Sequence, residues 1–321
     1  MRVLLTTTSF QDTPGPHHET LAKTGYEIVA ARGPLSEQQM LDIVREKGPF
    51  DATLNGDDAF TPKVIDAMMP ALKVIAKYGI GLDSVDVKYA TSRKLPVLYT
   101  PGVNHTTVAE HAIGLMIALA KHFWVHMAVV KGGQWKRVTG YELYGKTLAV
   151  MGLGRIGKEV AKRAAAFEMK LLGYDVYWDE PFAHQYRIKR CCSLDEALSQ
   201  ADVVSLHMPM TAETKEFINA ERIAKMKDKA MIVNTARGGL VNERDIVAAC
   251  KSRKLLGYAT DVLEAEPMKA PHPFQDVDNI IVTPHVGSRT YESVERQAMR
   301  AVLNLANFLS GDPDYIQANK W

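Results

Sequence analysis

Short apolar runs alternate with longer amphipathic stretches along the first hundred residues of the chain. The apolar runs are four or five residues long and rich in Val, Ile and Leu, which is typical of buried strands. The stretches between them, such as residues 36–46, have the length and spacing of helices. Parallel strands joined by crossover helices produce this alternation. The predicted strands are residues 2–6, 26–30, 52–54, 73–77 and 97–99.

A second and clearer series of apolar runs follows Tyr144. Its regular spacing suits a single doubly wound sheet of six strands. The predicted strands are residues 147–151, 170–174, 203–207, 231–235, 257–261 and 280–283. No low-complexity segment and no fixed-period repeat interrupts the two series, so the fold is predicted to be α/β with two doubly wound parallel sheets rather than a solenoid.

The strongest local motif is Gly152-Leu153-Gly154-Arg155-Ile156-Gly157, which directly follows the strand 147–151. Residues 158–167 then have the one-sided apolar pattern of a helix. In a dinucleotide-binding motif the first glycine allows a tight turn, the second lets the backbone approach the pyrophosphate, and the third lets the helix pack closely on the strand. The N–H groups at the helix start bind the anion. The motif in this context predicts dinucleotide binding.

Asp175 ends the next apolar run, 18 positions after Gly157. That is close to the offset expected of the carboxylate that binds the adenosine ribose. A carboxylate repels a 2′-phosphate, and the neighbouring residues 174–178 include no arginine to bind one. NAD is therefore expected rather than NADP.

Candidate chemistry also follows the later strands. Arg237 and His285 each stand just past the carboxyl end of a strand, where ligands bind in open α/β sheets. An arginine can hold a carboxylate bidentately, and an imidazole can donate or accept a proton near neutral pH. Each could instead be structural: Arg237 a surface arginine in a glycine turn, His285 a histidine fixed by its strand end. Glu266 and Glu264 are two residues apart, and either could be a surface charge.

The composition of the chain limits which partners and which cellular location are expected for the protein. The 321 residues are 46% hydrophobic and 24% charged, with room for two domains, and the net charge of +2 indicates neither a nucleic-acid nor a membrane partner. The basic runs 187–190 and 225–229 are expected to be solvated surface. The three cysteines cannot form a disulfide framework, and no group of Cys or His residues has the spacing of zinc ligands. This favours a reducing, cytoplasmic location. The start lacks the apolar core of a signal peptide, and the longest apolar stretch, 112–120, is expected to be a buried helix.

Four blocks, taken in order, resemble the D-2-hydroxyacid dehydrogenases, the family that includes phosphoglycerate dehydrogenase and glyoxylate/hydroxypyruvate reductase. They are residues 79–86, 100–111, 152–175 and 234–288, and the resemblance spans about 50–305. It implies two Rossmann-like domains with the active site in the cleft between them. Residues 1–102 and 288–321 would form the substrate-binding domain, and residues 103–287 the NAD-binding domain.

The resemblance also implies residue roles. Arg237 would orient the substrate carboxylate, His285 would act as acid and base, and Glu266 would hold the imidazole. Besides Arg237 and His285, the substrate would meet Tyr78, Ile80, Gly81 and Asn104. Many relatives have an arginine near the position of Tyr78, and its absence here argues against a phosphorylated substrate. Cofactor contacts would come from Val108, Gly152, Gly154, Arg155, Ile156, Gly157, Asp175, His207, Pro209, Thr235, Ala236, Asp261, His285 and Gly287.

Two other functions share this fold. One is an NAD-sensing, corepressor-like binding protein, which would bind NADH without consuming it. The other is a dehydrogenase that oxidises formate or phosphite. The resemblance implies a homodimer formed through residues 108–121 and 123–135, although a helix buried within one subunit would have a similar pattern. Glyoxylate, hydroxypyruvate, a sugar-derived keto acid and phosphohydroxypyruvate remain open as substrates.

Overall fold

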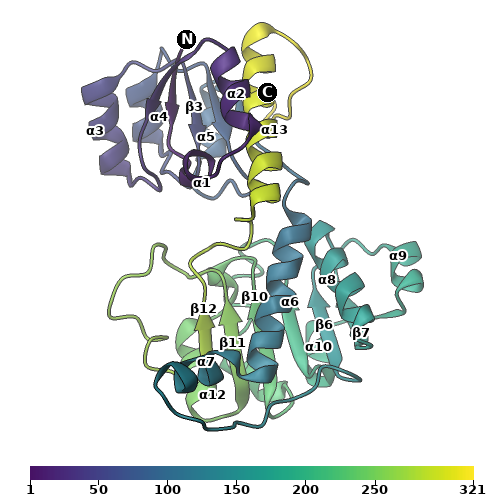
Figure 1. Ribbon diagram of the computed structural model, residues 1–321. Coiled ribbons are helices and arrows are strands. Elements are labelled where there is room, and N and C mark those ends of the chain that lie inside the picture. Colours follow the sequence, from purple (N-terminus) through teal and green to yellow (C-terminus); the bar gives the residue numbers. More distant parts are fainter. The chain divides into compact units, whose positions relative to one another are not determined.

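Two parallel β-sheets, each with helices on both faces, make up the protein in the computed structural model, which describes residues 1–321 (Figure 1). The chain divides into two units. Unit 1 comprises Met1–Asn104 and Arg289–Trp321, and unit 2 comprises His105–Ser288. The α/β fold class predicted from the alternating pattern is confirmed.

Unit 1 contains a five-stranded sheet in the order β2-β1-β3-β4-β5, so the strand order reverses next to β1. The strands are β1 Arg2–Leu5, β2 Glu27–Ala30, β3 Ala52–Asn55, β4 Val74–Lys77 and β5 Val97–Leu98. Helices α1 Thr8–Asp12, α2 Pro16–Lys23 and α13 Tyr291–Ser310 cover one face, and α3 Glu37–Lys47, α4 Pro62–Met68 and α5 Val87–Ser92 the other.

Burial on both faces explains the continuous apolar runs of these strands. Along β4, Val74 belongs to the hydrophobic cluster beneath α13, whereas Ile75 belongs to the cluster beneath α3 and α4. Local signals define the helix ends. Ser36 accepts a hydrogen bond from the backbone of Gln39, whose side chain bonds back to Ser36, and this capping box begins α3.

Unit 2 contains a seven-stranded sheet in the order β12-β11-β10-β9-β6-β7-β8. The order reverses between β6 and β9, as in doubly wound nucleotide-binding sheets. The strands are β6 Thr147–Met151, β7 Lys170–Tyr174, β8 Ile188–Arg190, β9 Val203–Leu206, β10 Ala230–Asn234, β11 Leu255–Thr260 and β12 Ile280–Val282.

The helices of unit 2 also form two layers. α6 His105–Lys121, α8 Arg155–Ala166 and α9 Glu180–Gln185 pack on one face, and α10 Leu194–Gln200, α11 Ala220–Lys225 and α12 Glu243–Lys251 on the other, with a short 3₁₀ turn, η1, at Gly238–Leu240.

No single helix is long and apolar enough to cross a bilayer. The pair of α6 and α7 (Phe123–Lys131), bent by 65°, has the required length and composition only when taken together.

The strand predictions hold for both sheets with one exception. The second sheet has seven strands rather than six, because residues 188–190 of the basic run form the edge strand β8. Ile188 is buried there while Lys189 and Arg190 are exposed. Charged side chains on the solvent-facing positions of an edge strand are common, and they concealed the strand in the sequence.

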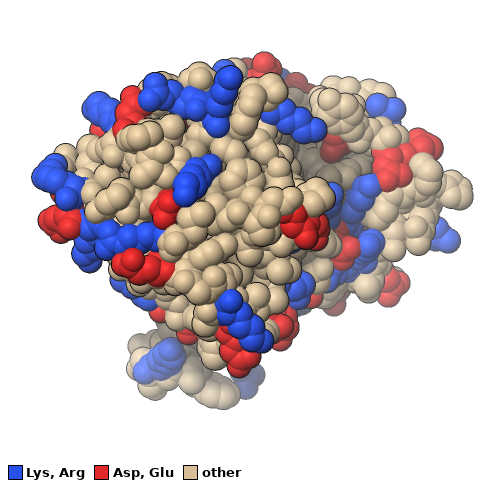
Figure 2. All heavy atoms as spheres, turned by 90° about the horizontal axis from the view of Figure 1, so that it is seen from above, with Lys and Arg blue, Asp and Glu red and all other residues tan.

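Surface charge is mixed in sign. On the face drawn in Figure 2, the Lys and Arg side chains lie among Asp and Glu side chains, and no large patch carries charge of one sign only. Many of the charges are in pairs, such as Arg32 with Asp12 and Lys63 with Glu37. This face therefore offers no continuous positive surface of the kind that binds a phosphate backbone.

The packing predicts which thiols react. Burial raises the pKa of Cys250 to about 12 and also raises the pKa of Cys191, whereas Cys192 is exposed. Because the thiolate is the reactive form, iodoacetamide at pH 8 should label Cys192 alone in the folded protein and all three cysteines after unfolding. Mass spectrometry of the labelled peptides measures this. Native labelling of Cys250, or labelling that persists in Cys192→Ser, would contradict the packing described.

Candidate active site

The glycine turn lies between β6 and α8, and each of its glycines has a separate steric reason. Gly152 has φ +97°, and a Cβ there would come within 2.8 Å of the His207 carbonyl oxygen. A Cβ on Gly157 would come within 1.9 Å of the Gly152 oxygen. A Cβ on Gly154 would meet nothing within 4 Å, and Gly154 is exposed at the start of α8. The turn therefore presents open backbone at a helix N-terminus.

Asp175 follows the end of β7 and is tied to this turn. Its Oδ2 accepts a hydrogen bond from the backbone N–H of Leu153 at 2.5 Å, and its Oδ1 accepts one from Tyr177 at 2.8 Å. The carboxylate is partly exposed beside the glycine turn. A group that binds a ribose next to a pyrophosphate needs this placement.

Two buried polar atoms stand at the ends of the neighbouring strands β9 and β10 without a hydrogen-bond partner, Nδ1 of His207 and Oγ1 of Thr235. The other ring nitrogen of His207 bonds Ser205 Oγ at 2.7 Å. Burial lowers the pKa of His207 to about 3, so its imidazole is neutral at pH 7. Unpaired buried polar atoms are rare in proteins, and at a strand end they indicate a position for a ligand.

Arg237 stands in the turn after β10, and Asn234 shapes that turn. The buried Asn234 side chain accepts a hydrogen bond from the Ala236 N–H at 3.0 Å and donates one to the Arg237 carbonyl at 2.9 Å. A Cβ on Gly238 would lie within 1.9 Å of the Leu263 backbone. Glycine at this position therefore allows the Arg237 turn to lie close against the loop that carries Glu266.

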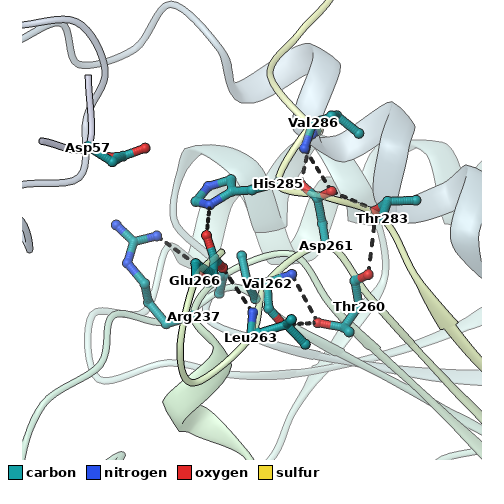
Figure 3. Close-up of polar contacts among 12 residues, drawn as sticks. Asp57, Arg237, Thr260, Asp261, Val262, Leu263, Glu266, Thr283, His285 and Val286 are labelled. Atoms are coloured by element: carbon teal, nitrogen blue, oxygen red, sulfur yellow. Dashed lines mark hydrogen bonds and ion pairs between the residues drawn. The ribbon is translucent and has the colours of Figure 1, made fainter. Parts of the chain in front are cut away.

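His285 and Glu266 form a direct pair, with His285 Nδ1 and Glu266 Oε2 2.7 Å apart (Figure 3). The backbone N–H of Leu263 donates to Glu266 Oε1 at 2.9 Å, which fixes the orientation of the carboxylate. Glu264 contributes only a backbone contact, to Glu243. Of the two glutamates, Glu266 is the one that contacts the imidazole.

The turn after β12 converges on Asp261, which is 3% exposed. The N–H of His285 donates to the Asp261 carbonyl, and the N–H groups of Val286 and Gly287 donate to its two carboxylate oxygens, at 2.9, 2.9 and 2.7 Å. His285 has φ +51°, an uncommon backbone conformation for a residue other than glycine. The catalytic candidate is therefore held in a strained turn.

The predicted substrate residues Tyr78, Ile80, Gly81 and Asn104 belong to unit 1. Ile80 is 40% exposed in the turn after β4, while Tyr78 packs in the hydrophobic cluster of α1 and α13, where burial raises its pKa to about 12. Thr100 fixes the turn by accepting from the Gly79 N–H and donating its own N–H to the Gly79 carbonyl. Asn104 is buried at the end of the N-terminal part of this unit.

A family model described as "D-isomer specific 2-hydroxyacid dehydrogenase, NAD binding domain" matches residues 113–287. The chain belongs to the D-isomer specific 2-hydroxyacid dehydrogenase family. The family resemblance seen in the sequence motifs is thereby confirmed, and the protein is an NAD-dependent oxidoreductase.

Relatives cover nearly the whole chain. A glyoxylate reductase of Thermofilum pendens is 38% identical over 89% of this chain and 86% of its own length. A D-3-phosphoglycerate dehydrogenase of Methanocaldococcus jannaschii is 37% identical over 92% of this chain, which spans only 57% of that relative. The crystal structure of the TT0316 protein of Thermus thermophilus is 35% identical, with a TM-score of 0.87 over 98% of this chain and 99% of the other.

NAD is the cofactor of this dehydrogenase, and the residues of unit 2 fit it. The open backbone at Gly154 and the N-terminus of α8 suit the pyrophosphate, and Asp175 suits the ribose. The unpaired atoms of His207 and Thr235 lie at the ends of β9 and β10, which stand between β6 with its glycine turn and β12 with His285 in the sheet order. The other predicted contacts in this unit are Val108 in α6, Arg155 and Ile156 in the first turn of α8, Pro209 after β9, Ala236 beside Arg237, and Gly287.

Asn234, His111 and Thr283 had no role predicted from the sequence, yet all three make contacts at this edge of the sheet. Asn234 shapes the Arg237 turn, and the other two bond to one another beside Asp261. An asparagine at a strand end followed by a turn is a recognisable signal. His111 comes from a helix far away in the chain, and only the fold brings it to this turn.

Adding a methyl group at Gly154 tests whether the cofactor binds at the glycine turn. Gly154 has φ −70°, which suits alanine, and its added Cβ would touch nothing in the protein. Gly154→Ala should therefore keep the melting temperature of the parent while weakening NADH binding by about 10-fold or more, because the methyl group occupies the space that the pyrophosphate backbone contact needs. Fluorescence titration with NADH measures the effect.

Gly114→Ala is the matched control, since its Cβ would also meet nothing, but inside α6. It should leave NADH binding unchanged. Parent-like NADH affinity in Gly154→Ala would contradict the placement of the pyrophosphate at this turn.

Proposed function

We propose that this protein reduces a small, unphosphorylated 2-keto acid to the D-2-hydroxy acid with NADH, and catalyses the reverse oxidation with NAD. Arg237 binds the substrate carboxylate and carbonyl. His285, held by Glu266, donates the proton to the carbonyl oxygen. Glyoxylate is the leading candidate substrate, because the Thermofilum pendens relative named for it is similar over nearly its whole length.

The observation that carries the proposal is the 2.7 Å pair between His285 and Glu266 after β12, in the same unit as the glycine turn. A proton donor for carbonyl reduction must keep its proton until the substrate is bound, and a carboxylate on the far ring nitrogen stabilises the protonated imidazole. Since Glu266 engages Nδ1, the proton for the substrate is the one on Nε2.

The bound cofactor supplies or accepts the hydride at C2 of the substrate. The side chains of the protein do the rest. Arg237 offers a planar guanidinium to the carboxylate, and its Nη1 is oriented by the Ala236 carbonyl at 2.6 Å. In reduction, His285 delivers a proton to the developing alkoxide and becomes neutral. In oxidation the same imidazole removes that proton.

Residues of unit 1 would bind the substrate carboxylate from the turn after β4. The N–H groups of Ile80 and Gly81 make no hydrogen bond within the protein, and Ile80 is exposed, which supports their use as donors to an anion. Gly79, at φ +125°, allows the sharp turn that presents them. Unit 1 would thus be the substrate-binding domain and unit 2 the NAD-binding domain.

The charge beside this turn favours an unphosphorylated substrate. The Lys77 side chain is 3% exposed and donates to the Gly56 carbonyl and to Asp57, both at 2.7 Å. Its charge is already balanced by a carboxylate, so it provides little attraction for a phosphate. Together with Tyr78 in the neighbouring position, this pair supports the assignment of a small keto acid.

A homodimer and a cytoplasmic location are further parts of the proposal. α7 exposes the apolar side chains of Phe123, Met127 and Val130, and a second copy of the chain would cover them. All three cysteines are free, which fits a reducing compartment.

The proposal predicts the result of an NADH absorbance assay with glyoxylate, hydroxypyruvate, pyruvate, 2-ketogluconate and 3-phosphohydroxypyruvate. The parent protein should oxidise NADH with glyoxylate or hydroxypyruvate and much more slowly with the phosphorylated acid. His285→Ala should lower kcat roughly 100- to 10,000-fold, the usual contribution of a general acid. Arg237→Ala should lower kcat/KM by about 100-fold through loss of substrate orientation.

Arg253→Ala and His184→Ala, at exposed positions away from the strand ends that carry the site, are the matched controls and should retain activity. Binding of NADH without turnover of any keto acid, together with no activity on D-hydroxy acids, formate or phosphite, would refute the proposal and favour the NAD-sensing function.

A further inference from the structure

A second group of polar residues supports the turn that carries His285 (Figure 3). Three consecutive backbone N–H groups, at positions 285–287, all donate to Asp261. The His285 N–H donates to the Asp261 backbone carbonyl, and the left-handed backbone of His285 lets the next two N–H groups, of Val286 and Gly287, converge on the Asp261 carboxylate. The position of the imidazole therefore depends on where the Asp261 carboxylate stands.

That carboxylate is itself oriented by Thr283 and His111. Thr283 Oγ1 lies 2.6 Å from Asp261 Oδ1, and His111 Nε2 lies 2.9 Å from Thr283 Oγ1. Asp261 is nearly buried, so burial alone would raise its pKa. Hydrogen bonds from His111, Thr283 and the backbone N–H groups of Val286 and Gly287 outweigh burial, and the pKa of Asp261 is lowered. The carboxylate is therefore ionised at neutral pH.

The direction of each hydrogen bond follows from this charge. An ionised carboxylate only accepts, so the single hydroxyl proton of Thr283 points to Asp261. Thr283 must then accept from His111, which fixes the proton of His111 on Nε2. The bonds run from α6 through Thr283 to Asp261, an arrangement in which each bond polarises the next, and His111 Nε2 also lies 3.4 Å from Asp261 Oδ1.

Gly287 packs closely against both Asp261 and His111. A Cβ on Gly287 would lie 2.9 Å from Asp261 Oδ2 and 3.4 Å from the His111 ring, so the turn, the carboxylate and the imidazole of α6 are in tight contact. Residues from α6, the end of β11 and the end of β12 meet here. A buried carboxylate without a permanent cation adds little stability for its desolvation cost, so stability alone is a weak reason for this arrangement.

We propose that His111 and Thr283 are positioning residues for the His285 acid, acting through Asp261. The inference rests on the proposed function only for the role of His285. Loss of either hydrogen bond lets the carboxylate turn away, the N–H groups of Val286 and Gly287 lose their acceptors, and the imidazole beside them leaves its reactive position. Neither residue needs to touch the substrate or the cofactor.

Paired substitutions test this. Thr283→Val keeps the shape of the side chain and removes the hydroxyl, while Thr283→Ser keeps the hydroxyl. His111→Leu removes the donor, while His111→Gln keeps an N–H donor near the place of Nε2. Thr283→Val and His111→Leu should lower kcat by roughly 10- to 100-fold, as a small displacement of a catalytic group does. The dissociation constant of NADH should change little, and the Ser and Gln variants should recover most of the lost kcat.

A second readout does not depend on activity. Amide hydrogen exchange of the peptide that contains residues 285–287 should be faster in Thr283→Val and His111→Leu than in the parent, and near the parent rate in the Ser and Gln variants. If the parent reduces no keto acid, the proposed function fails, and the exchange rates alone then decide the positioning role.

Asp202→Asn controls for stability. Asp202 accepts from the Thr147 N–H at 2.8 Å at the amino end of β6, the opposite edge of the same sheet. It should lower the melting temperature without changing kcat or the exchange of residues 285–287. Unchanged kcat and exchange in Thr283→Val would overturn the inference. So would equal losses of kcat in Asp202→Asn and Thr283→Val at matched melting temperatures, since the role would then be structural only.

Discussion

The parallel direction of every strand in unit 2 is the constraint on which its site depends. Because the strands run the same way, the residues that follow them all emerge at one edge of the sheet. The glycine turn follows β6, Asp175 follows β7, Arg237 follows β10, and His285 follows β12. Residues more than a hundred positions apart in the chain thus share one edge of the sheet. An antiparallel strand would have sent its terminal residue to the opposite edge.

Strand direction brings the groups to the edge, but side-chain hydrogen bonds and close backbone contacts fix their orientation. Asn234 bonds both sides of the Arg237 turn, and Gly238 lets that turn approach the loop of Glu266. The Leu263 N–H donates a hydrogen bond to Glu266, and the Asp261 carboxylate accepts hydrogen bonds from the N–H groups of Val286 and Gly287. Each of these contacts is buried or partly buried and lies within one unit, so unit 2 by itself orders the His285–Glu266 pair and the turns around it. Such preorganisation is what a catalytic hydrogen-bond network needs.

Much of this could be predicted from the sequence, because strands buried on both faces leave continuous apolar runs and the glycine turn has a fixed spacing. The roles proposed for Arg237, Glu266 and His285 come from the family resemblance, since each residue alone had a structural explanation. The contact between Glu266 in a loop and His285 after a strand could not be read from their spacing in the sequence. The edge strand β8 was missed because its outward residues are charged. His111 and Thr283 were missed because they meet across 172 positions of chain, and only packing of α6 on the sheet joins them.

The most direct test of the account is the pH dependence of kcat/KM for keto acid reduction, measured in the parent and in Glu266→Gln. If His285 supplies the proton and Glu266 stabilises its charged form, the rate falls as the imidazole loses its proton, and this fall begins at lower pH in Glu266→Gln, whose amide carries no charge. The NADH dissociation constant should be the same in both proteins. A fall at the same pH in both proteins would show that the Glu266–His285 pair does not control the proton, and the account of the site would be wrong.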